Sequence, residues 1–275
     1  MHYSLVAGEQ ALAVYAYEEE LVHFERGLAA RDIALSGTEA ASQAALDDKT
    51  AALLFGLARA RSATRPNHQL QEAFSVLSRA FEYYFEAGNV ALAVAAAEFP
   101  IALLIHRIPG VSELLARALT MVPADSHEAG RLLSRYGGIL GCAEGDYEGA
   151  QHALRRAIAI ARRVRDVVLE VQTLTYAAAV SGYHLHYQES VDHGLAAIAL
   201  SSGDENSLSR WWTAFSLLSI GDLDAARPSA SVLRELAERP STSRSLAGGD
   251  LLVLTMLSGL EGDWKSGREF SGRGL

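Results

Sequence analysis

The sequence predicts an all-α protein built from repeated helix hairpins. One motif recurs along the chain: a turn, then an aromatic residue or leucine, then small residues three or four positions apart. Its clearest anchors are separated by 40, 36 and 41 residues (Tyr147, Tyr187, Leu223 and Trp264). Hydrophobic residues make up 49% of the chain, Ala and Leu dominate, and no alternation of Val, Ile and Thr indicates strands. A period of this length is typical of helical repeat arrays.

The stretch 145–161, GDYEGAQHALRRAIAIA, shows the motif most clearly. Its Gly-Asp pair predicts a turn whose aspartate caps the next helix. Small residues then share one helical face with a leucine between them (Ala150, Leu154 and Ala157). They allow close approach of a second helix, which is predicted over 132–141. One hairpin cannot bury its own apolar face, so neighbouring copies must cover it.

The motif gives a single domain over residues 1–275. Its approximate hairpins cover 1–35, 47–87, 88–123, 127–165, 166–202, 205–240 and 244–275. Pro100 predicts a break in the first helix of the third hairpin, because proline lacks a backbone donor and clashes with the preceding turn. Pro228 is expected early in its helix, where a missing hydrogen bond costs little.

These residues resemble the tetratricopeptide repeat (TPR) family, whose second helix carries a small–aromatic–small pattern closed by a proline. Gly56 and Gly138 occupy the family's glycine position, whereas its first-helix tryptophan and tyrosine are mostly replaced by Leu, Ala and Gly. The resemblance covers nearly all of the chain. It implies a right-handed α-solenoid of about six to seven degenerate TPR-like hairpins, with a role in binding and no catalytic residues.

Two phrases resemble the TPR region of large bacterial signal-transduction ATPases and LuxR-type transcriptional regulators. They are AYEEELVHFERGLAA at 16–30 and EGDYEGAQHALRRAIAIA at 144–161. Repeat arrays normally end in polar capping helices, and the pattern predicts none at either end. We therefore expect the chain to be one module of a larger regulator.

Composition excludes several classes of protein. The net charge of −9 argues against general affinity for nucleic acid, which needs clustered cations. Cys142 is the only cysteine, so no internal disulfide can form and a reducing compartment is expected. The N-terminus lacks the basic and apolar regions of a secretory signal. The longest apolar stretch, 90–105, is interrupted and shorter than the roughly 20 residues of a membrane helix. We expect a cytoplasmic protein without membrane contact.

No motif predicts an enzyme, a cofactor or a metal site. The chain has neither a phosphate-binding GxxxxGK[ST] nor a GxSxG sequence. The glycines of GGILG (137–141) are interpreted as close helix packing rather than nucleotide binding. No HExxH motif and no Cys/His cluster of the kind that binds a metal ion includes His184, His186 or His193. These three are interpreted as turn and surface histidines. Cys142 is interpreted as a small packing residue.

An arginine stripe follows one helix, with pairs seven residues apart (Arg155 and Arg162, Arg156 and Arg163). A solvated outer face is the favoured interpretation, and binding of RNA or an acidic partner is the alternative.

The predicted partner-binding residues come from the geometry of TPR arrays, in which the first helix of each pair lines a concave groove. They are Arg135, Tyr136, Gln172, Tyr176, Tyr183, Trp211, Trp212 and Phe215. Aromatics with an arginine are enriched in binding hot spots. The alternative is that Tyr176, Trp211 and Phe215 pack between repeats.

The sequence therefore predicts a non-catalytic scaffold or sensor segment of a bacterial regulatory protein. It would bind a protein or peptide in the concave groove, with the aromatic residues in apolar contact and Arg135 meeting a carboxylate. The alternative is a small-molecule effector-binding domain of a signalling ATPase or transcriptional regulator. Direct binding to nucleic acid is not expected.

Overall fold

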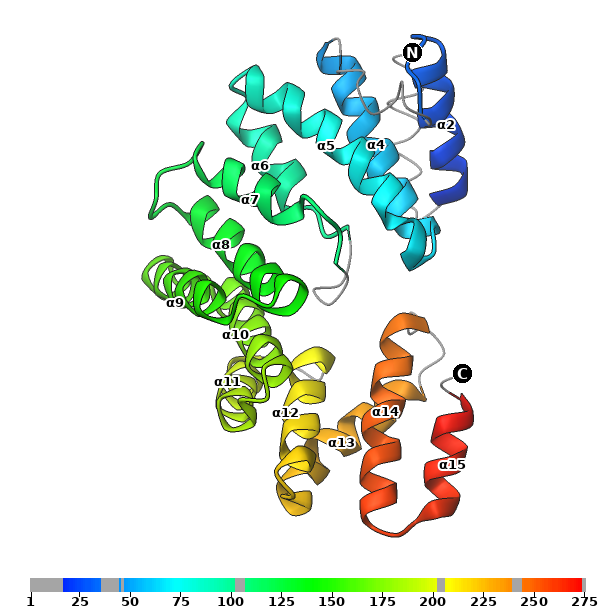
Figure 1. Ribbon diagram of the computed structural model, residues 1–275, viewed down its shortest axis with the longest axis vertical. Helices are drawn as coiled ribbons and strands as arrows, with labels where there is room; N and C mark the ends of the chain where they lie inside the picture. Colours follow the sequence, from blue (N-terminus) through cyan, green and yellow to red (C-terminus); the bar gives the residue numbers. More distant parts are fainter. Residues whose placement is uncertain are drawn as a thin grey trace. The chain divides into compact units, whose positions relative to one another are not determined.

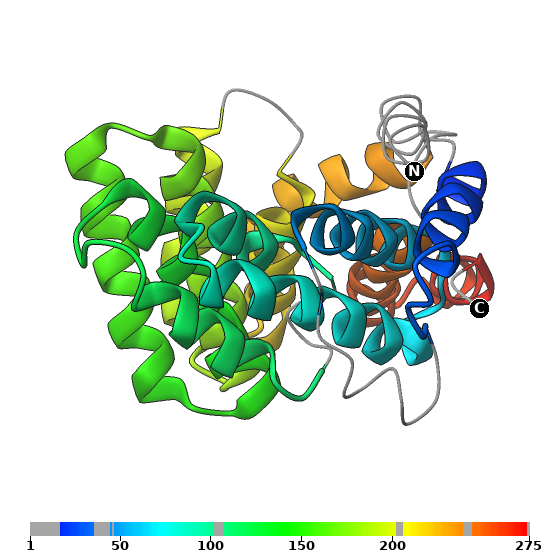
Figure 2. The same ribbon diagram turned by 90° about the horizontal axis from the view of Figure 1, so that it is seen from above.

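The computed structural model confirms the all-α class in the residues that it describes. These are 17–35, 45, 47–101, 107–201, 206–238 and 244–273. In these ranges thirteen α-helices pack mainly on their neighbours in the chain, joined by turns and short loops (Figures 1 and 2). The first helix of the predicted hairpin 1–35 lies outside the described residues, as does most of the segment 36–46. The right-handed solenoid and the seven hairpins stay predictions.

The chain divides into two compact units, residues 1–139 and 140–275, called unit 1 and unit 2 below. The described α-helices of unit 1 are α2 (Tyr17–Ala29), α4 (Asp48–Thr64), α5 (Leu70–Glu86), α6 (Val90–Glu98), α7 (Val111–Leu119) and α8 (His127–Ile139). A short 3₁₀ turn, η1 (Asn67–Gln69), leads into α5.

Unit 1 shows why particular residues form and end its helices. Gly56 of α4 allows close packing, because a Cβ atom there would collide with the ring of Phe24 on α2. This explains the glycine at one of the positions that the sequence singled out. Helix α6 ends at Glu98, two residues before Pro100, so the break predicted from that proline is confirmed.

Ion pairs link the helices of unit 1. Arg117 of α7 forms a bidentate ion pair with Glu82 of α5, and its guanidinium lies 4.5 Å from the ring centroid of Phe85. Arg131 of α8 donates from Nε to Glu98 of α6 at 2.8 Å. Each pair joins a helix to the second helix before it, so these contacts hold alternate helices in register.

Unit 2 begins with a π-helical turn, η2 (Leu140–Glu144), that continues α8. Its α-helices are α9 (Tyr147–Val164), α10 (Val167–Tyr183), α11 (Tyr187–Leu200), α12 (Ser207–Ser219), α13 (Leu223–Ala237), α14 (Arg244–Leu260) and α15 (Trp264–Arg273). Each packs on the next along the chain, and α12 also contacts both α10 and α14 directly. The first helices of the last three predicted hairpins are therefore neighbours.

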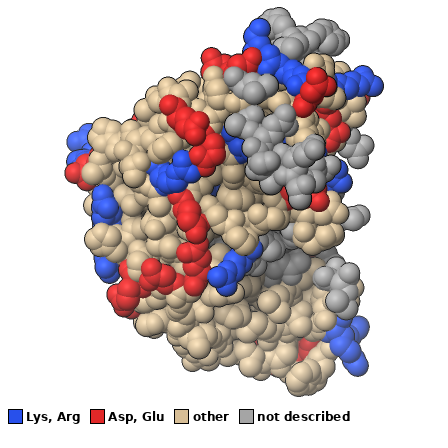
Figure 3. All heavy atoms as spheres, turned by 45° about the horizontal axis from the view of Figure 1, so that its top comes forward, with Lys and Arg blue, Asp and Glu red and all other residues tan. Residues whose placement is uncertain are grey.

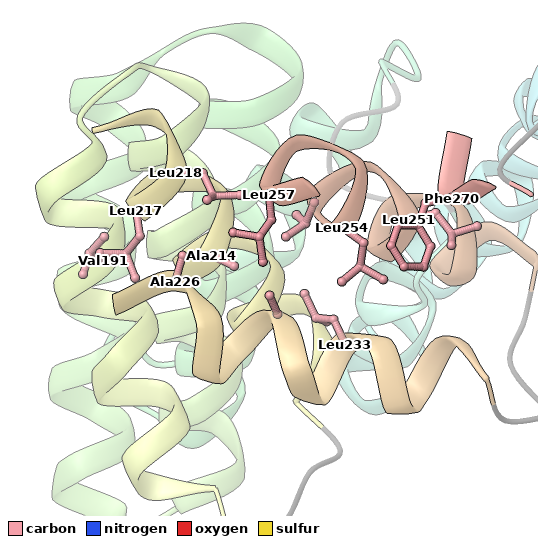
Figure 4. Packing of buried hydrophobic residues seen from close by; sticks show 12 residues of the cluster. Val191, Ala214, Leu217, Leu218, Ala226, Leu233, Leu251, Leu254, Leu257 and Phe270 are labelled. Atoms are coloured by element: carbon pink, nitrogen blue, oxygen red, sulfur yellow. The ribbon is translucent and has the colours of Figure 1, made fainter. Parts of the chain in front are cut away.

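A leucine-rich core joins the last helices of unit 2 (Figure 4). Leu217 and Leu218 come from α12, Leu233 comes from α13, and Leu254 and Leu257 come from α14. All five are buried, each worth about 1.5–3 kcal/mol of transfer free energy. Smaller residues at Ala214 and Ala226 leave room for these leucines, as the motif of small residues predicts.

The glycine-rich end of α8 leads into the π turn. A Cβ atom on Gly141 would lie 2.5 Å from a methyl group of Val180 on α10, so the predicted close helix packing is confirmed there. The π turn itself was not predicted. It adds one residue to the turn, so that the Asp146 N–H donates to Leu140 O, six residues back.

The position of Pro228 differs from the sequence expectation. Helix α13 begins at Leu223, which places Pro228 sixth in the helix, beyond the first turn. Its missing N–H therefore removes a hydrogen bond that a regular helix would make to the Asp224 carbonyl. The helix nevertheless continues to Ala237, because Leu233 and Leu236 are buried against the core.

No helix in the described ranges combines the length and the apolar character needed to cross a membrane.

Candidate functional site

Helix α10 carries three of the predicted partner-binding residues on its surface. Gln172 and Tyr176 are four residues apart, and the Gln172 side-chain amide donates to the Tyr176 hydroxyl at 3.0 Å. Gln172 is exposed and Tyr176 is half-buried. Tyr183 ends the helix and is 51% exposed. These side chains offer apolar rings with amide and hydroxyl groups to a ligand.

Helix α12 carries an aromatic cluster in which the rings contact one another. Trp211 and Phe215 stack with centroids 5.1 Å apart, and both pack against the leucine core of unit 2 while staying half-buried. Tyr187, at the start of α11, meets Phe215 edge to face at 6.2 Å. Tyr187 was predicted as a repeat anchor and not as a member of this cluster.

Trp212 has a different environment from its neighbour Trp211. Its side chain is 7% exposed, and its ring lies over Gly182 of α10, where a Cβ atom would come within 2.6 Å of Cε3. The ring thus fills the space between α10 and α12, and leaves little surface for a ligand. Trp212 is therefore part of the packing between helices.

Charge is distributed unevenly between the helices of unit 2. The segments 171–183 of α10, 211–220 of α12 and 251–260 of α14 contain no Asp, Glu, Lys or Arg. The helices α9, α11, α13 and α15 between and beside them all carry charged residues. Because α12 contacts both α10 and α14, the uncharged segments are neighbours.

Six of the exposed and half-buried side chains of these segments are called the neutral face below. Its members are Gln172, Tyr176, Trp211, Phe215, Leu252 and Met256. The two residues from α14 were not predicted, because the prediction rested mainly on aromatic rings and α14 has none. The sequence signal that could have located them is the absence of charged residues from 251–260 in α14.

Arg135 and Tyr136 lie on α8 in unit 1, whereas the other six predicted residues lie in unit 2. Arg135 is 8% exposed and donates from Nη1 to the Glu98 main-chain carbonyl at 3.5 Å. A buried guanidinium directed at the end of α6 is poorly placed to meet a carboxylate from solution. Tyr136 is half-buried. Neither residue enters the surface proposed below.

A second group of polar side chains joins the turns before α9 and α11. The Tyr147 hydroxyl donates to Glu189 Oε2 at 2.5 Å, and its ring stacks on His186 with centroids 4.5 Å apart. Burial, reinforced by the bond to Glu189, raises the pKa of Tyr147. His184 makes a hydrogen bond of 2.9 Å with the Gly141 carbonyl. These contacts fix the two turns to each other.

The titratable groups of unit 2 form no metal centre that the structure reveals. Among the described residues, no group of three or more His, Cys, Asp or Glu side chains is placed to hold a metal ion. Burial lowers the pKa of His193, against the opposing charges of Glu189 and Asp192. Cys142 is buried, and burial raises its pKa to about 12. A thiol with so high a pKa is a poor nucleophile.

The arginine stripe on α9 is exposed over most of its length. Arg162 donates from Nε to Glu170 of α10 at 2.6 Å. On the molecular face shown in Figure 3, basic side chains are scattered among acidic ones rather than gathered in one patch. Binding to an acidic partner stays an untested alternative.

Compared with models of known protein families, the chain matches none, and the comparison with curated proteins finds no match.

Proposed function

We propose that this chain is a TPR-like α-solenoid that binds an uncharged, apolar segment of a protein partner on the neutral face. The observation that supports this most is the absence of charge from long segments of three neighbouring helices, 171–183, 211–220 and 251–260, which expose aromatic and aliphatic side chains. Natural proteins rarely expose apolar surface over several adjacent elements unless it binds something. The proposal also extends the resemblance of the sequence to TPR regions of bacterial regulators, in which this chain would act as a scaffold or sensor segment.

The chemistry of the face defines the partner. Trp211 and Phe215 supply a flat aromatic surface, and Leu252 and Met256 supply flexible aliphatic contact. Gln172 and Tyr176 add polar groups that can bond to the main chain of a peptide. A charged ligand group would be desolvated there without an opposite charge to compensate. The preferred ligand is therefore a peptide with aromatic or branched aliphatic side chains and no charge at its centre.

The test is a peptide selection against the immobilised chain, followed by binding measurements on one synthetic consensus peptide. We expect random-sequence phage libraries to yield peptides with apolar, uncharged centres. Fluorescence polarisation should then show that Gln172→Glu/Tyr176→Glu weakens binding of the consensus peptide at least tenfold. The variant His152→Glu/Gln188→Glu adds the same two charges on exposed positions of α9 and α11 and should bind normally.

Thermal unfolding of both variants shows whether each is folded, since all four positions are exposed or half-buried. The proposal fails if both variants lose affinity equally, if neither does, or if the selection enriches no apolar sequence.

A further inference from the structure

The four turns that precede α9, α11, α13 and α15 share one backbone design, and one of these four departs from it in sequence. The turn before α10 has the same design, with Arg165 at φ 59° in the left-handed position and Asp166 as the cap. Each of the four turns places a residue in the left-handed region: Gly145, Leu185, Gly221 and Gly262, with φ of 80°, 65°, 86° and 81°. The N–H of the residue that follows it donates back into the preceding helix, in three of the turns to the carbonyl five residues earlier. Three turns follow the glycine with an aspartate.

The aspartates cap the helices that begin there. Asp146, Asp222 and Asp263 each accept the N–H three residues later, at 2.9, 3.0 and 3.1 Å. In the turn between α10 and α11, the glycine is replaced by Leu185 and the aspartate by His186, whose side chain makes no capping bond. Leucine in this conformation is strained.

Burial does not offset the strain, because Leu185 is 70% exposed. Its apolar side chain is therefore exposed to water, and its backbone holds a conformation that glycine adopts more easily. Backbone strain that is not offset by packing is characteristic of functional positions. The same turn exposes Tyr183 at 51%, and the neighbouring turns expose Ile220 at 46%, Leu260 at 55% and Trp264 at 69%.

Contacts between the turns place them on one edge of unit 2. Tyr147 bonds to Glu189, which links the turns before α9 and α11. Arg227 bonds to both Asp224 and Glu261, which links the turns before α13 and α15. Between these pairs, Ser216 of α12 donates to Ser190 of α11 at 2.8 Å. The residues 144–148, 183–189, 220–224 and 260–265 are called the turn edge below.

The turn edge is strongly acidic. It contains eight carboxylates and one lysine. Arg227 neutralises part of this charge, and the excess of acid remains. Carboxylates alternate along the edge with the exposed Leu185, Ile220, Leu260 and Trp264. An anionic ligand is disfavoured at the N-termini of α9, α13 and α15, because aspartates already occupy the capping positions there.

We propose that the turn edge is a second docking surface, which binds a basic amphipathic protein segment with alternating cationic and apolar side chains. Charge complementarity defines this occupant: Lys or Arg side chains meet the carboxylates, while apolar side chains cover Leu185 and the other exposed residues. The surface shares no residue with the neutral face, although Tyr187 of the turn edge meets Phe215 edge to face. It prefers cationic ligands where the neutral face prefers uncharged ones, so the two proposals can be tested separately.

The probe is a fluorescein-labelled amphipathic helical peptide of Leu and Lys, compared with the matching peptide of Leu and Glu. We expect the Lys peptide to bind the whole chain and the Glu peptide to bind at least tenfold more weakly. Leu185→Gly should weaken binding of the Lys peptide at least threefold. The same variant should raise the melting temperature by roughly 2 °C or more, because glycine relieves the strain. Loss of binding with a gain of stability cannot result from unfolding.

Two further variants test the role of charge. Glu144→Gln/Glu148→Gln removes two carboxylates of the turn edge. It should weaken binding of the Lys peptide and make that binding less dependent on the salt concentration. Glu235→Gln/Glu238→Gln removes two exposed carboxylates near the other end of α13 and should change neither. Gln172→Glu/Tyr176→Glu should bind the Lys peptide no more weakly than the natural chain, which separates this surface from the neutral face. Unchanged binding by Leu185→Gly, or equal losses in the two glutamine variants, would overturn the proposal.

Discussion

Asp47 shows how a single side chain fixes the start of one helix to the end of another. Its carboxylate accepts the Thr50 N–H at 2.8 Å and caps α4, and it also accepts from the Arg31 guanidinium after α2, with one bond of 2.8 Å to Nη2. The hydrogen bonds from Arg31 and then Thr50 hold the pKa of Asp47 well below its usual range. The carboxylate is nearly half exposed, so solvent weakens the ion pair.

The prediction at this scale is a pH-dependent loss of stability in Asp47→Ala. At pH 7 the variant should lose about 1 kcal/mol of unfolding free energy, chiefly through the missing cap. A carboxylate whose pKa is lowered by folding stabilises the protein above its unfolded pKa of about 3.9, and this contribution disappears as the pH falls. Urea unfolding at pH 7 and pH 3 should show the difference from the natural chain shrinking. Asp47→Asn keeps a cap without charge and should lose less at pH 7; an unchanged difference at pH 3 would refute the role of charge.

At the scale of the element, α13 contains a proline in its interior, where this residue normally destabilises a helix. Pro228 removes one main-chain hydrogen bond in the helix interior. Pro228→Ala should therefore raise the free energy of unfolding by about 1–3 kcal/mol, because it restores the donor and relieves the ring clash. Denaturant unfolding followed by circular dichroism measures this change.

The control is a proline outside any helix interior. Pro66 precedes the 3₁₀ turn η1 and is exposed. Pro66→Ala should lower the free energy of unfolding by less than about 1 kcal/mol, because alanine gives the unfolded chain more conformational entropy. Opposite signs for the two variants are the expected result. A loss of stability in Pro228→Ala would show that the proline shapes a bend on which α13 depends.

At the scale of the whole molecule, Cys142 is a natural probe because it is the only cysteine in the chain. It is buried in the π turn, and burial raises its pKa to about 12. The unfolded thiol ionises near pH 8.5, so alkaline pH favours the unfolded state. The natural chain should lose stability between pH 8 and pH 10, and Cys142→Ala should lose less over the same interval. Urea unfolding at both pH values gives the comparison, and equal losses would contradict the burial of the thiol.

The sequence by itself determined the helical class and the positions of most turns. Gly-Asp pairs, the break at Pro100 and the small residues that allow close packing are all local signals, because a turn, a cap or a helix end depends on a few adjacent residues. The close approach at Gly141 confirms the interpretation of the glycines in 137–141, and Gly56 allows a similar approach.

The tertiary structure alone decided which side chains reach the surface. Trp211 and Trp212 are adjacent in sequence, yet one lies half-buried and the other fills the space over Gly182. Arg135 was expected to reach a partner and is buried beside α6. The left-handed Leu185 and the extra residue of the π turn were also not predicted. Neighbouring residues on a helix point about 100° apart, so their exposure depends on where a helix some 30 to 40 residues away packs, and local sequence does not contain that information.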